Sequence, residues 1–152
     1  MDELDSAIIT ELQRDARQTN RELARRLGVA PSTCLERVRA LRARGAILGY
    51  RAVIAPATLN RGVEAFVSTR LRPLSRTVID SFKAAAIEMP EVLAVYVIAG
   101  EEDFLIHVAV PDLARLHDFL VDRLSKRREV LSFRSQIVYQ SAHKDVIERL
   151  PE

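Results

Sequence analysis

The chain has 152 residues, 48% of them hydrophobic, and a formal net charge of +2, and this length allows one ordinary domain or two small ones. No apolar run approaches the roughly 20 residues that a membrane-spanning helix needs, and the acidic start lacks the positive charge of a secretory signal. The single cysteine, Cys34, excludes an intrachain disulfide and a thiolate zinc site. We therefore expect a cytoplasmic protein with no membrane partner.

The first fifty residues predict three helices. Asp5 is interpreted as the N-cap of the first helix, because its carboxylate can accept hydrogen bonds from the amides of the first turn. Thr19 and Glu22 form the capping-box pattern that begins the second helix. Pro31 suits the first position of a third helix, which Gly45 ends. Two helices joined by a short turn containing glycine are typical of a helix-turn-helix.

The third helix combines an apolar stripe with a cluster of arginines. Cys34, Val38 and Leu41 recur at helical spacing and are predicted to face the core. The segment Arg37–Arg44 holds four arginines and no acid, which favours a nucleic-acid partner. After Gly45, the segment Ala46–Tyr50 is predicted to form a short wing strand.

The second half alternates strands and helices in a recognisable order. Residues 51–63 are interpreted as a linker that contains one further short strand. The elements expected after it are the strand Glu64–Arg72, the helix Ser75–Met89, the strands Val92–Ala99 and Phe104–Val110, a helix that Asp112 caps, and the strand Val130–Gln140. Strand-helix-strand repeated twice is the ferredoxin-like βαββαβ unit, so the fold class is α+β.

These elements divide the chain into four parts. We expect a winged helix-turn-helix DNA-binding domain over residues 1–50, a linker over 51–63, a ferredoxin-like domain over 64–141, and a tail over 142–152. The tail is either polar and irregular or a helix around Val146, Ile147 and Leu150.

The strand Val92–Ala99, taken as a middle strand of the sheet, is apolar at nearly every position. A strand with one face in water alternates apolar and polar residues. The missing alternation predicts that both sheet faces are buried, the second one by a partner subunit. We therefore expect a homodimer that forms through the second domain.

The sequence resembles the Lrp/AsnC (feast/famine) family of bacterial and archaeal transcriptional regulators over nearly its whole length. The resemblance is carried by Leu4-Asp5, Asn20–Ala24, Leu27–Val38, Gly45–Tyr50 and the turn Gly100–Phe104. It implies a winged helix-turn-helix joined to a ferredoxin-like ligand-sensing domain. It also implies dimers that often assemble into tetramers or octamers, pseudo-palindromic sites on double-stranded DNA, and an amino acid or related small molecule bound between subunits. That effector alters assembly or DNA affinity.

The candidate DNA-binding residues follow from the helix-turn-helix geometry, in which the start of the recognition helix meets base edges. Arg37 is predicted to contact guanine, while other arginines of the helix bind phosphate. The amide end of the second helix is a further phosphate site. The full set is Thr19, Asn20, Ser32, Thr33, Arg37, Arg39, Arg42 and Arg44. The alternative is that these arginines only make the helix soluble.

The candidate effector residues surround the turn that begins at Gly100. An α-amino acid needs an acceptor for its ammonium group, for which Asp103 is the candidate, and donors for its carboxylate, for which the amides near Gly100 are candidates. Glu101 belongs to the same turn, Ser135 stands where the resembled family often has threonine, and Tyr96 is a further candidate. The alternative is that the turn uses glycine and acids only for its geometry.

Three residues depart from the family pattern at these sites. Ala30 stands where the family often has a serine N-cap before Pro31, and alanine caps about 1 kcal/mol less well than serine. Glu101 replaces the usual aspartate, and Ala99 replaces a hydroxyl residue before Gly100, so the predicted effector pocket differs from the usual one.

Other function classes are weighed against this interpretation. The three histidines lack metal-ligand spacing, and we expect no metal, no cofactor and no enzyme activity, because no nucleophile–base pair or phosphate loop is present. Two alternatives remain, an architectural DNA-binding protein that needs no ligand and a ferredoxin-like enzyme that acts on a small molecule.

Overall fold

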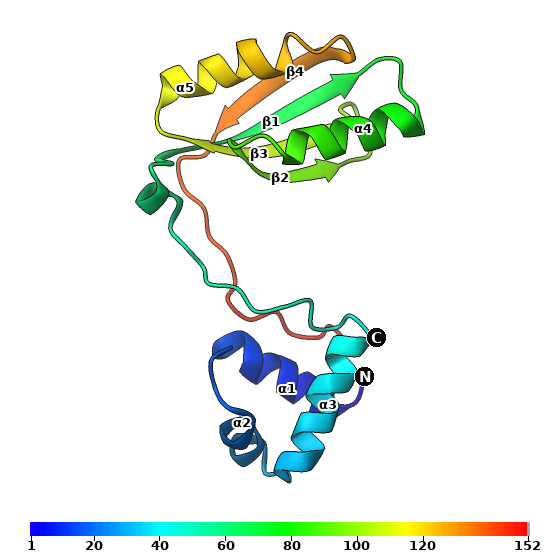
Figure 1. Ribbon diagram of the computed structural model, residues 1–152, viewed down its shortest axis with the longest axis vertical. Coiled ribbons are helices and arrows are strands. Elements are labelled where there is room, and N and C mark those ends of the chain that lie inside the picture. The colour runs from blue at the N-terminus through cyan, green and yellow to red at the C-terminus, as the bar shows by residue number, and fades with distance from the viewer. Residues whose placement is uncertain (152) are drawn as a thin grey trace. The chain divides into compact units, whose positions relative to one another are not determined.

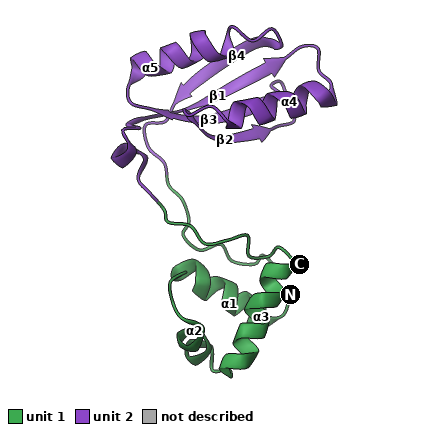
Figure 2. Ribbon diagram, in the orientation of Figure 1, with its two compact units in different colours: residues 1–53, 142–152 green, residues 54–141 purple. Residues whose placement is uncertain are grey.

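A computed structural model describes residues 1–151 of the chain. The polypeptide forms two compact units (Figure 2), which are described separately. Unit 1 comprises residues 1–53 together with the C-terminal segment from Ala142, and unit 2 comprises residues 54–141. Figure 1 labels the elements within each unit.

Unit 1 contains the three predicted helices, α1 (Glu3–Arg14), α2 (Asn20–Leu27) and α3 (Pro31–Ala43). The helices pack around a small core in which each helix contributes at least one side chain. The fully buried members are Ile8, Leu23, Ala24, Cys34 and Leu41. The helix-turn-helix expectation is thus confirmed in its two packed helices, α2 and α3.

The predicted caps of α2 and α3 are present. The Thr19 hydroxyl accepts a hydrogen bond from the Glu22 amide at 3.2 Å, and the Glu22 carboxylate accepts one from the Thr19 amide at 2.8 Å. Helix α3 begins at Pro31 after Ala30, whose side chain makes no cap hydrogen bond. It ends at Ala43 with Arg44 as its C-cap, and the next residue, Gly45, has a φ of +74°, the left-handed conformation that glycine adopts without strain.

The predicted N-cap of α1 is wrong. Asp2 caps the helix, and its carboxylate accepts a hydrogen bond from the Asp5 amide at 2.8 Å. Asp5 lies one turn inside the helix and is buried, with 4% of its surface exposed. Both aspartates are good caps by residue type, but an N-cap at Asp2 adds a turn to the helix and frees the Asp5 carboxylate for the ion pairs described below.

The wing strand predicted for Ala46–Tyr50 and the strand predicted in the linker are not formed. Residues 46–55 are irregular, and a 3₁₀ helix follows at Pro56–Leu59. A strand needs a hydrogen-bonded neighbour, and within the described residues of unit 1 no extended segment pairs with 46–50. The C-terminal segment likewise contains no helix between residues 138 and 151.

Unit 2 is an antiparallel sheet with helices on one face (Figure 1). Its elements are β1 (Val63–Leu71), α4 (Arg76–Ile87), β2 (Val92–Val97), β3 (Phe104–Val110), α5 (Leu113–Asp118) continued by a π-helix (Phe119–Leu124), and β4 (Val130–Ile137). The strand order is β2-β3-β1-β4 with antiparallel pairing throughout. This is the ferredoxin-like order, so the α+β expectation is confirmed.

The core of unit 2 lies between the helices and the covered face of the sheet. Strand β1 alternates strictly, with Ala65, Val67, Thr69 and Leu71 buried. Phe82 of α4 packs against Phe104 of β3, with ring centroids 4.8 Å apart. The β1 alternation shows that the helices cover only one face of the sheet.

The second, open face of the sheet carries apolar and aromatic side chains. Phe66 of β1 stacks on His107 of β3 at 4.7 Å, and the His107 Nε2 lies 2.8 Å from the Glu64 carboxylate. Leu105 and Tyr96 stand opposite each other in the register of β3 and β2. Strand β2 is an edge strand of this sheet, so its assignment as a middle strand is wrong, because the ferredoxin crossing places β1 and β3 in the centre.

Among residues 1–151, no helix has both the length and the apolar character that crossing a membrane requires.

Candidate DNA-binding and effector sites

The outer surface of α3 carries polar side chains that form no hydrogen bond or ion pair with the other described residues. Ser32 and Thr33 are exposed in its first turn. Arg39 and Arg42 are also exposed, and neither forms a hydrogen bond or ion pair with any residue that the structure describes. These four predicted residues therefore lie on one helix with their polar atoms available to a partner.

Arg37 and Arg44, by contrast, are tied to α1. Arg44 Nη2 lies 2.7 Å from Asp5 Oδ2, and Arg37 Nη1 lies 3.2 Å from Asp5 Oδ1. Arg37 Nη1 also forms an ion pair with Asp2. Both guanidinium groups remain almost half exposed, at 41% and 46% of the side chain.

The helical spacing explains this pairing. Arg37 follows Cys34 by three residues and precedes Leu41 by four, and Arg44 follows Leu41 by three. Residues three and four apart share a helix face, so both arginines lie beside the buried stripe and next to α1. The same spacing could have identified Asp5 as their partner, because Asp5 precedes the buried Ile8 by three residues.

The charges of this cluster shift one another's protonation. Burial acts to raise the pKa of Asp5, but the hydrogen bond from Arg44 and the charges of both arginines outweigh it, and the pKa is lowered. The pKa of Asp2 is lowered first by the hydrogen bond from the Asp5 amide and then by Arg37. The Asp2 hydrogen bond and charge raise the pKa of Arg37. All three groups are therefore charged at neutral pH.

Thr19 and Asn20 serve the junction of α2 and α3. The Thr19 side chain is used in the capping box, and Asn20 Nδ2 donates to the Pro31 carbonyl at 2.8 Å. This bond ties the first turn of α2 to the first turn of α3. The Thr19 hydroxyl and the Asn20 Nδ2 group are thus used within unit 1, whereas Asn20 Oδ1 is buried without a hydrogen-bond partner among the described residues. Phosphate binding at the first turn of α2 stays a prediction.

The turn between β2 and β3 brings together three of the five predicted effector residues. Gly100 has a φ of +146°, which side chains rarely adopt. The Glu101 side chain is 87% exposed, and its carboxylate lies 3.9 Å from Arg134. Asp103 Oδ2 accepts a hydrogen bond from the Leu71 amide at 2.7 Å and lies 3.5 Å from Arg72. One Asp103 oxygen therefore anchors the turn to the end of β1.

Tyr96 and Ser135 are not brought together within one chain. Residues opposite each other in neighbouring strands point to the same face. Tyr96 pairs with Leu105 on the open face, whereas Ser135 pairs with the buried Val67 on the helix-covered face. The two residues also lie on β2 and β4, the opposite edges of the sheet.

Glu102 is a candidate that the sequence analysis missed. Its side chain is only 15% exposed, and Oε1 accepts from Arg134 at 2.6 Å. Its Oε2 is shielded from solvent and has no hydrogen-bond partner, like the hydroxyl of the nearby Thr69. Buried polar atoms rarely lack a partner, so Glu102 joins Asp103 as a candidate residue of this turn. Residues 101–103 are all acidic, and nothing in this run of the sequence indicates that the side chain of Glu102 is the one that turns inward.

Comparison with protein families matches both units. The model for the AsnC-type helix-turn-helix domain matches residues 1–42, and the model for the Lrp/AsnC ligand binding domain matches residues 64–146. Within the described residues, no group of three or more His, Cys, Asp or Glu side chains could hold a metal ion. These matches define a DNA-binding transcriptional regulator with a separate ligand-binding domain.

Individual relatives agree over most of the chain. The HTH-type transcriptional regulator AldR of Mycolicibacterium smegmatis is 37% identical over 92% of this chain and 82% of its own. The leucine-responsive regulatory protein of Salmonella typhimurium is 34% identical over 92% and 85%. The solved structure of a Neisseria meningitidis transcriptional regulator in complex with L-Met has a TM-score of 0.88, with 30% identity over 99% of this chain and 96% of that one. The chain belongs to the Lrp/AsnC family.

Proposed function

We propose that the protein is a sequence-specific regulator whose α3 enters the major groove of DNA and whose second unit responds to an amino acid. The observation that carries the DNA-binding part is the set of unpaired polar groups on the exposed side of α3, namely Ser32, Thr33, Arg39 and Arg42. Since its target is chromosomal DNA, we place the protein in the cytoplasm.

The two pairs of arginines have different roles in this proposal. A guanidinium carries five N–H donors, so Arg37 and Arg44 keep donors for phosphate while Asp5 fixes their position. Arg39 and Arg42 are free to reorient, and Arg39, five residues after Cys34, lies on the outward side. Thr19 and Asn20 mark the amide end of α2 as another phosphate site. Contact between Arg37 and guanine stays a prediction, which the next experiment separates from phosphate binding.

The test uses DNA sites selected by the wild-type protein from a random pool. For a base-contacting arginine, replacement by alanine costs about 1–3 kcal/mol of specific binding and relaxes base preference, whereas a phosphate contact weakens all sequences alike. Arg37→Ala and Arg39→Ala are compared by fluorescence anisotropy on selected and scrambled DNA. Arg14→Ala, on α1 and paired with Glu11, is the control. Unchanged affinity in both test variants refutes the interface.

The effector part of the proposal assigns the turn Gly100–Asp103 to a small amino acid. It is supported by the family match of residues 64–146 and by the L-Met complex of the Neisseria relative. Asp103 has one oxygen without a partner among the described residues, which leaves it available for an ammonium group. Because Tyr96 and Ser135 lie apart in one chain, we place any role for them in a site completed by a second subunit.

Thermal shift tests this assignment. We expect an amino acid, with L-methionine as the first probe, to raise the melting temperature of the wild-type protein, and Asp103→Ala to abolish that shift. Glu88→Ala, an exposed acid at the end of α4, should retain it. If no amino acid or related metabolite gives a shift that depends on Asp103, the effector site is wrong. A DNA footprint that never changes with effector would favour the architectural alternative.

The open face of the sheet supports assembly. Phe66, Leu105 and Tyr96 present apolar surface there, and a large exposed apolar patch commonly marks a protein interface. We propose that two copies bury these faces against each other as a homodimer, and that dimers assemble further into tetramers or octamers.

A further inference from the structure

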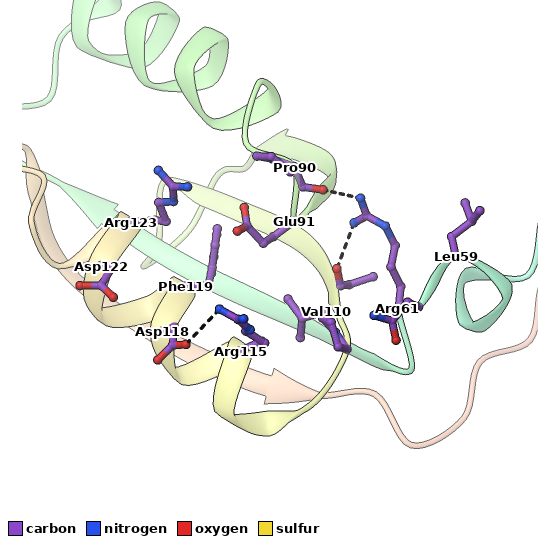
Figure 3. A pocket seen from close by; sticks show the side chains of 13 residues that line it. Leu59, Arg61, Pro90, Glu91, Val110, Arg115, Asp118, Phe119, Asp122 and Arg123 are labelled. Carbon is purple, nitrogen blue, oxygen red and sulfur yellow. Dashed lines mark hydrogen bonds and ion pairs between the residues drawn. The ribbon is translucent and has the colours of Figure 1, made fainter.

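A second cavity lies in unit 2, at the far end of β3 from the Gly100 turn. It has a volume of about 500 Å³, within the usual range for small-molecule sites. Figure 3 shows its lining, in which the π-helix and α5 face the start of β2 and the end of β3. Strand β3 runs from Phe104 beside the turn to Val110 beside the cavity, so the two places are about 20 Å apart at the rise of a strand.

One side of the cavity is held in place by Arg61. Its guanidinium donates to the Ala109 carbonyl at 3.0 Å and to the Pro90 carbonyl at 2.5 Å (Figure 3). These bonds join the end of β3 to the segment that enters β2. Arg61 therefore has a structural role, because its guanidinium group donates hydrogen bonds to two main-chain carbonyl oxygens.

Glu91 offers an unused acceptor inside the cavity. Among residues 1–151, neither of its carboxylate oxygens has a hydrogen-bond partner, and Oε2 is shielded from solvent. A buried acceptor without a donor destabilises the protein by the desolvation penalty of that group. The Oε1 oxygen of the same carboxylate is not shielded in this way, and it is the acceptor that an N–H donor of a ligand can reach.

Arg123 offers the complementary donor. It lines the same cavity and forms no hydrogen bond or ion pair within residues 1–151, although its charge acts on the adjacent Asp122. Arg115, at the rim, is held only by a 3.7 Å pair with Asp118 in which both side chains are more than half exposed. A free guanidinium binds a carboxylate through two parallel hydrogen bonds.

The balance of charge and the apolar wall define the ligand. The lining contains three arginines and three acids, so the cavity as a whole is neutral and suits a ligand that carries both signs. Phe119 and Val110 are buried and give the cavity an apolar wall. We propose that this cavity is a second small-molecule site, which binds a zwitterionic α-amino acid with its ammonium group on Glu91, its carboxylate on Arg123 and its side chain against Phe119.

Calorimetry on the full chain tests the site in the Asp103→Ala background, where the turn site is removed. L-leucine is the probe, with 3-methylbutylamine and 4-methylpentanoate as analogues that each lack one charge. We expect one L-leucine per chain, and binding about 10- to 100-fold weaker for either analogue, because each loses a charge-assisted hydrogen bond. Asp103→Asn, which keeps the side-chain shape, replaces Asp103→Ala if the latter unfolds.

Glu91→Gln and Arg123→Gln should each weaken L-leucine binding about 10- to 100-fold, as expected for the loss of one charge-assisted hydrogen bond. The controls Glu88→Gln and Arg128→Gln, exposed residues that do not line the cavity, should leave it unchanged. Absence of binding in the Asp103 variants, or equal affinity in Glu91→Gln and its control, overturns the proposal. Inorganic phosphate that competes with L-leucine and binds independently of Glu91 would show a simple anion site and also overturn it. If the Asp103 variants lose L-leucine binding and Glu91→Gln does not, the turn Gly100–Asp103 is the effector site and the cavity is not.

Discussion

The DNA-recognition helix α3 and the turn Gly100–Asp103 differ in how complete each site is within a single chain. In unit 1, Asp5 joins α1 to two arginines of α3, and the buried core of the three helices is complete within the chain. In unit 2, the turn leaves a Glu102 oxygen without a partner, and its two further candidates lie on opposite faces of the sheet. A helix can present a site by itself, whereas a site at a sheet edge depends on what covers the sheet.

The largest effect that bears on this comparison is expected on the open face. Leu105→Arg places a charge among the apolar side chains of β3, and an unpaired charge buried in an interface opposes association strongly. We expect the mass in light scattering to fall from dimer to monomer at micromolar concentration. Leu113→Arg, at an exposed position that begins α5, should leave the mass unchanged. A wild-type protein that is already monomeric would contradict the assembly of unit 2.

The next effect concerns the completeness of unit 1. Asp5→Ala removes the acceptor of Arg44 and one of the two acceptors of Arg37, and hydrogen bonds to charged groups contribute about 1.5–3 kcal/mol. We expect amide hydrogen exchange in α1 and α3 to report a loss of about 2 kcal/mol, together with weaker DNA binding. Glu3→Ala, an exposed acid in the same turn, is the matched control. Equal protection in the two variants would show that the cluster does not stabilise the helix.

The same contact predicts a smaller, pH-dependent effect. The pKa of folded Asp5 lies below its unfolded value, which is about 3.9. Its ion pairs therefore stabilise unit 1 fully above roughly pH 5 and are lost as the pH falls through the folded pKa. Urea midpoints measured by circular dichroism should fall more steeply below about pH 4 for the wild type than for Asp5→Asn. Parallel curves would exclude Asp5 as the titrating group.

The smallest expected effect is a gain. Ala30 leaves the first amides of α3 without a side-chain acceptor, so Ala30→Ser should stabilise unit 1 by about 1 kcal/mol. Thermal unfolding checks this, with Ala43→Ser at the far end of α3 as a control that adds a hydroxyl where no N-cap is needed. A gain in both variants would show that the cap is not the cause.

Local signals predicted much of this structure. The capping box at Thr19, the proline start of α3 with the glycine after its end, and the extended run at Glu64–Arg72 each depend on neighbouring residues only, and all are observed. The βαββαβ order then determined the sheet topology. Local signals could not decide between Asp2 and Asp5 as the N-cap of α1, because both are aspartates. In the structure Asp2 is the N-cap, and Asp5 pairs with arginines of another helix.

Features that depend on distant partners could not be predicted. The wing strand has no strand beside it, β2 becomes an edge only when β1 and β3 pair, and Glu102 turns inward because Arg134 of β4 holds it. Arg37 is predicted from the helical pattern to contact DNA, but in the structure one side of its guanidinium group faces Asp2 and Asp5 at the start of α1. A helical wheel gives the direction in which a side chain points. Whether that side chain meets an acidic residue depends on how α1 packs against α3.

The C-terminal segment joins unit 1 through Gln13, whose side-chain amide exchanges two hydrogen bonds of 2.9 and 3.0 Å with the main chain of Ile147. In topological terms, the ligand-binding unit is therefore an insertion within the DNA-binding unit, and the polypeptide passes between the units twice. A fluorophore or affinity tag attached after this segment would consequently report on, or interfere with, the DNA-binding unit, although the residues that precede it in the chain belong to the other unit.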